Sequence, residues 1–236
     1  MSGDLWYWPT IQGRGEFVRL FLEAAAIPYR DRAREDGVAA LVADVARRGA
    51  RGPFAPPYLD TGGVTIAQVA HILAWLADRH GLAPADEALG AWLIQLQLTV
   101  TDLVAEVHAV HHPVDASAYY EDQKPEAARA AAAFRVERLP KFLAHFDAAA
   151  RACDGPFVAG ERWSHVDTSL FQLVEGLPYA FPRRTAAIEG DYPHLLAVRD
   201  AVAAMPGIAA YLASDRRLSF TEEGILRHYP ELDGER

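Results

Sequence analysis

The sequence has a single cysteine, Cys153, among its 236 residues. One cysteine cannot form an internal disulfide, a CxxC redox pair or a cysteine-rich metal site. Cys153 lies in a turn-like stretch between Arg151 and Pro156, where we expect it to pack at a helix end rather than to act as a nucleophile. This composition excludes the disulfide-stabilised classes of protein.

An excess of positive charge is also missing. The formal net charge is −9 at pH 7, and the basic residues are scattered along the chain. Because binding to nucleic-acid phosphates requires a basic stripe or patch, we expect no nucleic-acid partner. A small anionic ligand stays open.

The sequence shows no secretory signal and no long apolar run. Met1 to Asp4 carry no basic region followed by an apolar one. The strongest apolar window, Ile66 to Ala77, is too short to cross a bilayer and contains Gln68 and His71. We expect a soluble cytoplasmic protein without a membrane partner.

What the sequence does contain is typical of a folded globular protein, since 51% of its residues are hydrophobic and 23% are charged. In the first eighty residues the hydrophobic period changes several times between that of a strand and that of a helix. The expected elements are strands at 5–8 and 29–32, helices at 16–26 and 38–48, extended pieces at 56–59 and 63–65, and a helix at 66–79. This βαβαββα order predicts a small mixed sheet with helices packed on it.

The pattern changes after a proline- and glycine-bearing stretch that we interpret as a linker at 81–87. Beyond it, strand signals nearly vanish. Helical spacing appears at 89–110, 126–150, 166–173 and 194–204, with proline or glycine between these segments. We therefore expect two domains, a mixed α/β domain at 1–80 and an all-helical bundle at 88–236.

Four motifs, in order along the whole chain, carry a family resemblance. They are Tyr7-Trp-Pro-Thr-Ile-Gln-Gly-Arg-Gly-Glu-Phe-Val-Arg19, Ala55-Pro-Pro-Tyr-Leu59, Ile66-Ala-Gln-Val-Ala-His-Ile-Leu-Ala-Trp-Leu-Ala77 and Gly160-Glu-Arg-Trp-Ser-His-Val-Asp167. Together they resemble the cytosolic glutathione transferase family, and the first resembles its tyrosine-type mu, pi and sigma-like classes. The resemblance implies that the N-terminal domain is thioredoxin-like and binds glutathione as a co-substrate.

The fourth motif also has a physical interpretation. Ser164 is placed to cap a helix, and Asp167, three residues on, can accept a hydrogen bond from the backbone N–H of the cap residue. Loss of either cap contact costs about 0.5–2 kcal/mol in typical helices. We therefore assign both residues to folding and not to the active site.

Glutathione chemistry requires stabilisation of a thiolate, because the free thiol has a pKa near ~8.5. Tyr7 offers a hydroxyl at the end of the first strand, just before a helix whose N-terminus carries positive dipole charge. The family implies this catalytic role; the alternative is that Tyr7 is a core aromatic. The turn after Tyr7 has one residue more than in the classes it resembles, so Thr10 is an alternate source of the hydroxyl.

The resemblance also implies a set of glutathione-binding residues. Pro57 matches a cis-proline whose neighbouring backbone pairs with the cysteinyl amide. Pro56, just before it, has no N–H to donate but keeps its carbonyl. Arg14 is a candidate partner for a glutathione carboxylate, and its alternative is a solvent-facing arginine at a helix start.

Gln68 matches the family's contact to the γ-glutamyl group, at the start of a helix whose free N–H groups attract a carboxylate. The next residue, Val69, stands where the family has serine or threonine, so only its backbone N–H remains. Asp102 resembles an acidic residue that some classes send across the dimer interface to the partner's glutathione; an exposed helix aspartate is equally expected.

Polar aromatic residues gather on the first long helix of the second half and just after it. His108 and His112 are four residues apart and therefore on one helix face, and Tyr119 and Tyr120 follow. We favour an electrophile pocket here over a zinc site, because the HExxH order is absent. We expect no metal.

Two functions follow from these residues. The first is a homodimeric glutathione transferase that attacks a small hydrophobic electrophile with the glutathione thiolate, or reduces a peroxide with it. The second is a binding or scaffold protein of the same fold with weakened or lost catalysis, which the altered positions Pro56 and Val69 suggest. A histidine-site metalloprotein is a weaker third alternative.

Overall fold

The N-terminal unit of the computed structural model, which describes residues 3–236, is built on a four-stranded sheet with the order β2-β1-β3-β4. The strands are β1 (Gly3–Trp6), β2 (Tyr29–Asp31), β3 (Tyr58–Asp60) and β4 (Thr65–Ala67). Strand β1 runs parallel to β2 and antiparallel to β3, and β3 runs antiparallel to β4. Leu5 lies opposite Asp31 on one side and Leu59 on the other.

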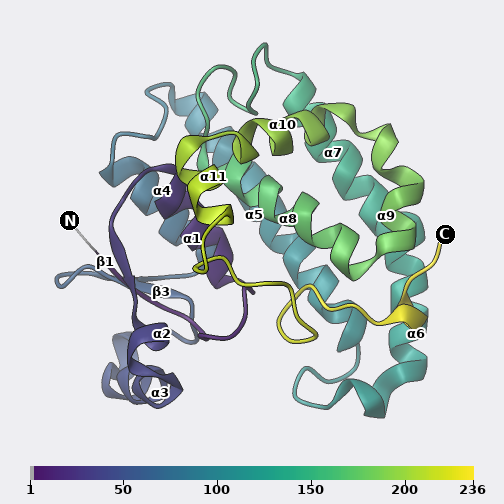
Figure 1. Cartoon of the computed structure of the whole chain (residues 1–236), viewed down its shortest axis with the longest axis horizontal. Helices are drawn as coiled ribbons and strands as arrows, with labels where there is room; N and C mark the ends of the chain where they lie inside the picture. Colours follow the sequence, from purple (N-terminus) through teal and green to yellow (C-terminus); the bar gives the residue numbers. More distant parts are fainter. Residues whose placement is uncertain (1–2) are drawn as a thin grey trace.

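Helices cover both faces of this sheet (Figure 1). They are α1 (Gly15–Ala24), α2 (Arg32–Asp36), α3 (Val38–Arg47) and α4 (Val69–Arg79). Because side chains of a strand alternate between faces, Leu5 packs with α1 and α4 while its neighbour Trp6 stacks on Tyr58 in the core beside α3. The α/β arrangement predicted for the N-terminal half is confirmed.

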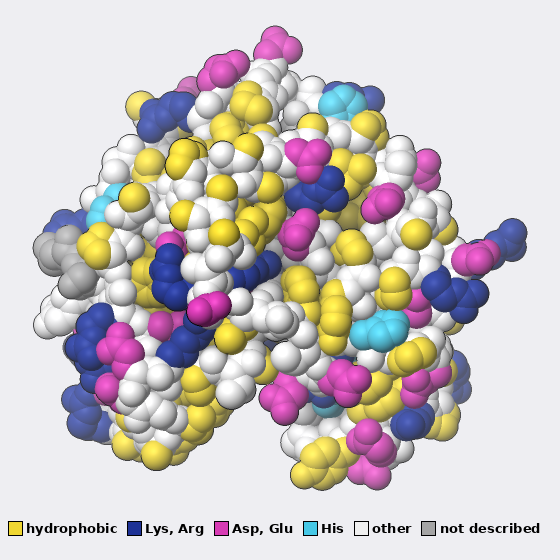
Figure 2. All heavy atoms as spheres, in the orientation of Figure 1, with side chains coloured by type: hydrophobic (Ala, Val, Ile, Leu, Met, Phe, Trp, Pro, Cys, Tyr) yellow, Lys and Arg dark blue, Asp and Glu magenta, His cyan; other side chains and the backbone are white. Residues whose placement is uncertain are grey.

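The C-terminal unit is helical. Its helices are α5 (Glu87–His111), α6 (Lys124–Ala133), α7 (Leu139–Arg151), α8 (His165–Ala180), α9 (Pro182–Ile188), α10 (Pro193–Ala203) and α11 (Pro206–Leu212). Helix α1 packs against α8 and α11, so Phe17 and Leu20 belong to the helical core and join the two units. In the view of Figure 2, basic and acidic side chains are interspersed and a notch separates the two units at the lower edge.

Helix α5 differs from what the sequence window suggested. Among the described residues, α5 is the one unbroken helix that is long and apolar enough to cross a membrane, with a mean hydropathy of 1.3 over its most apolar window. Of this window 33% is buried, and the buried apolar residues, among them Leu96 and Leu103, pack in the helical core against α6, α7 and α8, whereas Leu98 is 51% exposed. Packing within the protein therefore accounts for part of its apolar character.

Several element boundaries were predicted wrongly. The helix expected from Ile66 begins at Val69, because residues 65–67 pair with β3 and Gln68 has a φ of 70°, which a helix cannot include. The helix expected at 126–150 is two helices separated by a π-helical turn at 134–138, with Pro140 in the first turn of the second. The short helices α2, α9 and α11 were not anticipated.

The predicted helix cap at the start of α8 is confirmed. The Ser164 hydroxyl accepts a hydrogen bond from the Val166 N–H at 3.2 Å, and Asp167 accepts one from the Ser164 N–H at 2.7 Å. Asp167 is fully buried and also accepts from the Val158 N–H at 2.8 Å. The motif therefore closes the loop before α8 as well as capping the helix.

After α11 the chain crosses the front of the molecule as an extended segment toward α6 (yellow in Figure 1). We call residues 214–229 the C-terminal strap. Several contacts hold it, among them a hydrogen bond of 2.5 Å from the Gln12 side chain to the Leu218 carbonyl, the ion pair of Arg217 with Glu16 at 2.5 Å, and a hydrogen bond of 3.0 Å from His111 to the Ile225 carbonyl. The strap therefore covers the turn between β1 and α1.

Candidate active site

Tyr7 follows directly after β1, and its side chain is enclosed by the turn that leads into α1. Only 4% of Tyr7 is exposed, and its hydroxyl accepts a hydrogen bond of 2.8 Å from the Arg14 backbone N–H. Burial raises the pKa of Tyr7 above its usual value, although the Arg14 N–H acts in the opposite direction. The phenol therefore stays protonated at neutral pH and keeps its O–H as a donor.

Two glycines make this enclosure possible. Gly13 has a φ of 45°, and a Cβ there would overlap the Tyr7 hydroxyl. A Cβ on Gly15 would lie 2.5 Å from the ring carbon Cγ of the same tyrosine, which is closer than real Cβ contacts. The Gly-Arg-Gly sequence is thus required by the position of Tyr7. Thr10, the alternate hydroxyl, is exposed in the preceding turn.

A cleft of about 510 Å³ lies between the N-terminal unit and α5. It brings together five of the six predicted glutathione-binding residues, namely Arg14, Pro56, Pro57, Gln68 and Val69. Asp102 is exposed on α5 and does not line the cleft. Tyr7 does not line it either, but Arg14, whose backbone N–H contacts the Tyr7 hydroxyl, does.

One wall of the cleft is the connection between α3 and β3. The Pro56–Pro57 peptide bond is cis, as the sequence predicted for Pro57. Pro57 is buried and Pro56 is half-buried, and Tyr58 follows as the first residue of β3. The central sheet therefore fixes the position of the Pro56 carbonyl at the cleft edge.

The N-terminus of α4 forms the adjoining wall. Gln68 precedes this helix with a φ of 70°, a conformation that residues other than glycine rarely adopt and that is found at ligand sites. The first N–H groups of α4 have no intrahelical partner, as at every helix start, and α4 is 11 residues long. The wall can therefore bind an anionic group near Gln68 and Val69.

The opposite wall comes from α5, and sequence reasoning missed it. Gln97, Thr101 and Val104 line the cleft at helical spacings of four and three residues, and Phe17 of α1 and the exposed Phe54 and His71 line it too. The spacing of Gln97, Thr101 and Val104 in the sequence shows that they share one face of a helix. It does not show that this face meets the N-terminal unit.

The three histidines at the end of α5 pack against one another. The ring centroids of His108 and His112 are 5.1 Å apart, and His111 lies 4.7 Å from His112. The Nδ1 atoms of His111 and His112 are 2.5 Å apart, and the second ring nitrogen of His111 bonds to the strap at Ile225. Burial lowers the pKa of His108 to about 4 and that of His111 to about 3, so these imidazoles are neutral at pH 7.

The two predicted pocket tyrosines do not join this cluster in the same way. Tyr119 is 77% exposed in the loop after α5. Tyr120 is buried with its ring stacked 3.9 Å from that of Tyr229, and its hydroxyl donates to Glu231 at 3.0 Å. Within residues 3–236, no three His, Cys, Asp or Glu side chains are arranged to hold a metal ion.

Comparison with known proteins agrees with this architecture. The family model "Glutathione S-transferase, C-terminal domain" matches residues 108–215. The class-mu 26 kDa glutathione S-transferase of Schistosoma japonicum is 25% identical over 231 residues, which cover 95% of this chain and 94% of that protein. The corresponding isozyme of Schistosoma mansoni is 23% identical over 225 residues, covering 95% and 94%.

Solved structures share the fold. The Pi-class glutathione S-transferase of Onchocerca volvulus superimposes with a TM-score of 0.69 at 23% identity, covering 90% of this chain and 92% of that one. Prostaglandin synthase D of Nilaparvata lugens gives a TM-score of 0.72 at 19% identity, covering 93% and 100%. The C-terminal part of this chain therefore matches the glutathione S-transferase family model, the whole chain is similar in sequence to class-mu glutathione S-transferases, and it shares the fold of glutathione S-transferases.

Proposed function

We propose that the protein is a glutathione transferase that binds glutathione in the cleft between the N-terminal unit and α5. The observation that carries the proposal is the convergence, on one cavity, of the cis Pro56–Pro57 segment, the N-terminus of α4 with Gln68, and Arg14 of the turn around Tyr7. Glutathione needs a backbone pairing group, an anion site and a donor for its sulfur, and these three features supply them.

In this proposal each residue has one role. The γ-glutamyl carboxylate binds at the N-terminus of α4, where Gln68 and the Val69 N–H donate to it. The Pro56 carbonyl accepts from the cysteinyl amide. The Tyr7 O–H donates to the sulfur, so the thiolate is favoured over the thiol. Arg14 contributes positive charge beside the peptide.

The thiolate then attacks a small hydrophobic electrophile or reduces a peroxide. We place the electrophile near His108 and His112, at the end of α5, where the C-terminal strap closes over the turn that holds Tyr7. The neutral state of His108 suits an uncharged substrate. Tyr120 supports the strap through Tyr229, and the exposed Tyr119 would border the entrance.

We further propose a cytoplasmic homodimer. In each subunit, residues 81–87 link the N-terminal domain to the helical domain, between the end of α4 and the start of α5. The surface beside the cleft carries exposed apolar side chains, Phe54 at 97% and Leu98 at 51% exposure. A second copy placed there would cover them and bring Asp102 near the partner's cleft.

Replacing Tyr7 tests the catalytic role. In Tyr7→Phe we expect the thiol pKa of bound glutathione, followed by thiolate absorbance, to rise toward ~8.5, because the sulfur loses its donor. Turnover with an aryl halide electrophile should fall roughly 100-fold, the usual effect of losing one such donor.

Thr10→Val is the matched control, since Thr10 offers the alternate hydroxyl in the same turn. It should leave the thiol pKa unchanged. If Thr10→Val raises the pKa and Tyr7→Phe does not, the donor is Thr10.

Val69→Ser tests the anion site. A serine hydroxyl at the start of α4 adds a charge-assisted hydrogen bond to the γ-glutamyl carboxylate, so we expect glutathione to bind about 10- to 100-fold more tightly by calorimetry. Val69→Ala is the control for the change in shape. Equal affinities of the serine and alanine variants would place the carboxylate elsewhere.

The second candidate function is a binding or scaffold protein with the glutathione transferase fold and weakened or lost catalysis. The missing Pro56 N–H and the missing hydroxyl at Val69 favour it. Retention of the wild-type chain on immobilised glutathione, together with turnover in solution, supports the enzyme; retention without turnover supports the scaffold.

A further inference from the structure

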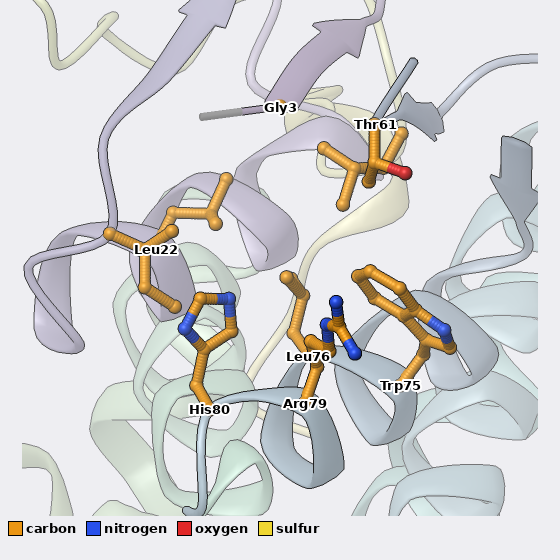
Figure 3. A pocket seen from close by; sticks show the side chains of 9 residues that line it. Gly3, Leu22, Thr61, Trp75, Leu76, Arg79 and His80 are labelled. Carbon is orange, nitrogen blue, oxygen red and sulfur yellow. The ribbon is translucent and has the colours of Figure 1, made fainter. Parts of the chain in front are cut away.

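The two ends of helix α1 are held in different ways. In its last turn, Leu22 is buried in one apolar core with Leu76 of α4. A cavity of about 340 Å³, lined by both leucines and by Arg79, lies at this end (Figure 3). Seven residues of helix, about 10 Å, separate Leu22 from Gly15, the first residue of α1. The turn before Gly15 is held by polar contacts instead.

Gln12 anchors this turn to two other parts of the chain. Its side chain is 5% exposed, and both of its polar atoms are used. Its Nε2 donates to the Leu218 carbonyl of the C-terminal strap at 2.5 Å, and its Oε1 accepts from Nε2 of Gln172 in α8 at 2.7 Å. Within residues 3–236, no other side chain of residues 8–14 makes a hydrogen bond. Gln12 is therefore the polar link between the turn and the helical unit.

This anchor is part of a closed ring of polar contacts. Oε1 of Gln172 accepts from Arg217 at 3.0 Å, and Arg217 pairs with Glu16 at 2.5 Å. The Glu16 N–H then donates to the Gln12 backbone carbonyl at 3.0 Å, which closes the ring at the turn. Gln172 and Glu16 are 1% and 0% exposed, so water does not compete for these contacts. Each amide keeps its orientation, because turning over would cost it its partners.

The residue after Gln12 lies against both the strap and Tyr7. A Cβ on Gly224 of the strap would lie 3.8 Å from the Gly13 Cα, so the two backbones are close together. Gly13 has a φ of 45°, and the next residue, Arg14, donates its backbone N–H to the Tyr7 hydroxyl at 2.8 Å. The position of that N–H therefore depends on the peptide units that Gln12 holds in place.

We propose that Gln12, supported by Gln172, is a positioning residue for the Tyr7 hydroxyl. The inference rests on the proposed function, in which the Tyr7 O–H donates to the glutathione sulfur. Because the hydroxyl oxygen accepts from the Arg14 N–H, its own proton is left for the sulfur, and accepting that bond makes the phenol a stronger donor. The turn has one residue more than in the classes it resembles, and the ring through Gln12 fixes its conformation.

The test follows the thiol pKa of bound glutathione by thiolate absorbance in Gln12→Met, which keeps the length of the side chain and removes both hydrogen bonds. We expect the thiol pKa to rise part of the way toward its value in Tyr7→Phe, because the donor is displaced and not removed. Turnover with an aryl halide should fall roughly 10-fold. Affinity for S-hexylglutathione, which lacks the thiol, should stay unchanged, since Gln12 does not line the cleft.

A double-mutant cycle with Tyr7→Phe separates positioning from a general loss of structure. If Gln12 acts through Tyr7, Gln12→Met causes no further rise of the thiol pKa in the Tyr7→Phe background. Gln172→Met breaks the same ring from α8 and leaves the sequence of the turn intact, so it should raise the thiol pKa as Gln12→Met does.

Gln123→Met is the matched control, because Gln123 is 3% exposed and its side chain donates to the Asp115 carbonyl at 2.9 Å. It should lower the unfolding midpoint in urea and leave the thiol pKa unchanged. An unchanged thiol pKa in both Gln12→Met and Gln172→Met, or an equal rise with and without the Tyr7 hydroxyl, would overturn the positioning role alone. A thiol pKa that does not respond to Tyr7→Phe would overturn the proposed role of Tyr7, and this inference with it.

Discussion

Replacing Glu16 by alanine should destabilise the protein by roughly 3–5 kcal/mol, the usual cost of removing one partner from a buried ionic network. Glu16 and Arg19 are both completely buried, and their side chains are 3.1 Å apart. The second Glu16 oxygen accepts from the Tyr211 hydroxyl at 2.8 Å and pairs with Arg217 at 2.5 Å. Alanine would leave two guanidinium groups and one hydroxyl short of a partner.

This network joins parts of the chain that are far apart in sequence. Glu16 lies in α1, Tyr211 in α11 and Arg217 in the C-terminal strap. Arg19 also pairs with Asp31, the last residue of β2, at 2.7 Å. The loss therefore weakens the joint between the two units and one of the attachments of the strap. Protease sensitivity of the strap should rise together with the loss of stability.

Urea unfolding measures the effect. Glu35→Ala is the matched control, because Glu35 forms an exposed ion pair with Arg30 and such pairs contribute little. Glu16→Gln keeps the shape and the Tyr211 contact but removes the charge, so its midpoint should lie between those of Glu16→Ala and the wild type. A midpoint for Glu16→Ala equal to that of Glu35→Ala would contradict the ionic role.

The second large effect is a loss of stability on acidification. Burial lowers the pKa of His111 to about 3 and that of His165 to about 4, against about 6.5 for an exposed histidine. His111 is 3% exposed and His165 is 5% exposed. In the unfolded chain both bind a proton below pH ~6.5, whereas in the folded protein they stay neutral until much lower pH.

The sign follows from proton linkage. Because the unfolded state binds more protons in this window, stability is complete above pH ~6.5 and falls as the pH is lowered toward ~4. Two such groups cost roughly 3 kcal/mol per pH unit, so the whole window removes about 5 kcal/mol or more, comparable with the stability of a typical domain. We expect the unfolding midpoint in urea to drop steeply between these pH values.

Variants separate the histidine contribution from that of other groups. His165→Leu removes a buried imidazole whose Nε2 has no hydrogen-bond partner, and it should flatten the pH dependence of stability. His111→Gln should flatten it too, while keeping a donor for the Ile225 carbonyl. His145→Gln, at an exposed position, is the control. Burial raises the pKa of Asp167, so its protonation acts in the opposite sense. A slope unchanged in both buried-site variants would assign the acid sensitivity to other groups.

The sequence was sufficient for the features that depend on neighbouring residues. The changes of hydrophobic period that predicted a first strand and a helix at 16–26, and the Ser164–Asp167 cap, are local patterns, and such patterns predicted the α/β-plus-helical architecture. Tyr7, Pro57 and Gln68 pointed to the glutathione transferase fold because each is recognised from a motif within a short segment, and the motifs follow in the expected order. The predicted element boundaries were wrong where pairing between distant segments overrode the hydrophobic period. Residues 66 and 67, predicted as the start of a helix, instead pair with β3 as part of the strand at 65–67.

Only the tertiary structure decided which distant residues meet. Gln97 and Thr101 line the same cleft as Gln68, Glu16 pairs with Arg217, and His111 bonds to Ile225. Each of these contacts depends on how α1, α5 and the strap pack. The single cysteine and the negative net charge already narrowed the chemistry from composition alone. The contact of Gln172 in α8 with Gln12 did not follow from them, because a helix periodicity fixes which residues share a face but not what that face meets.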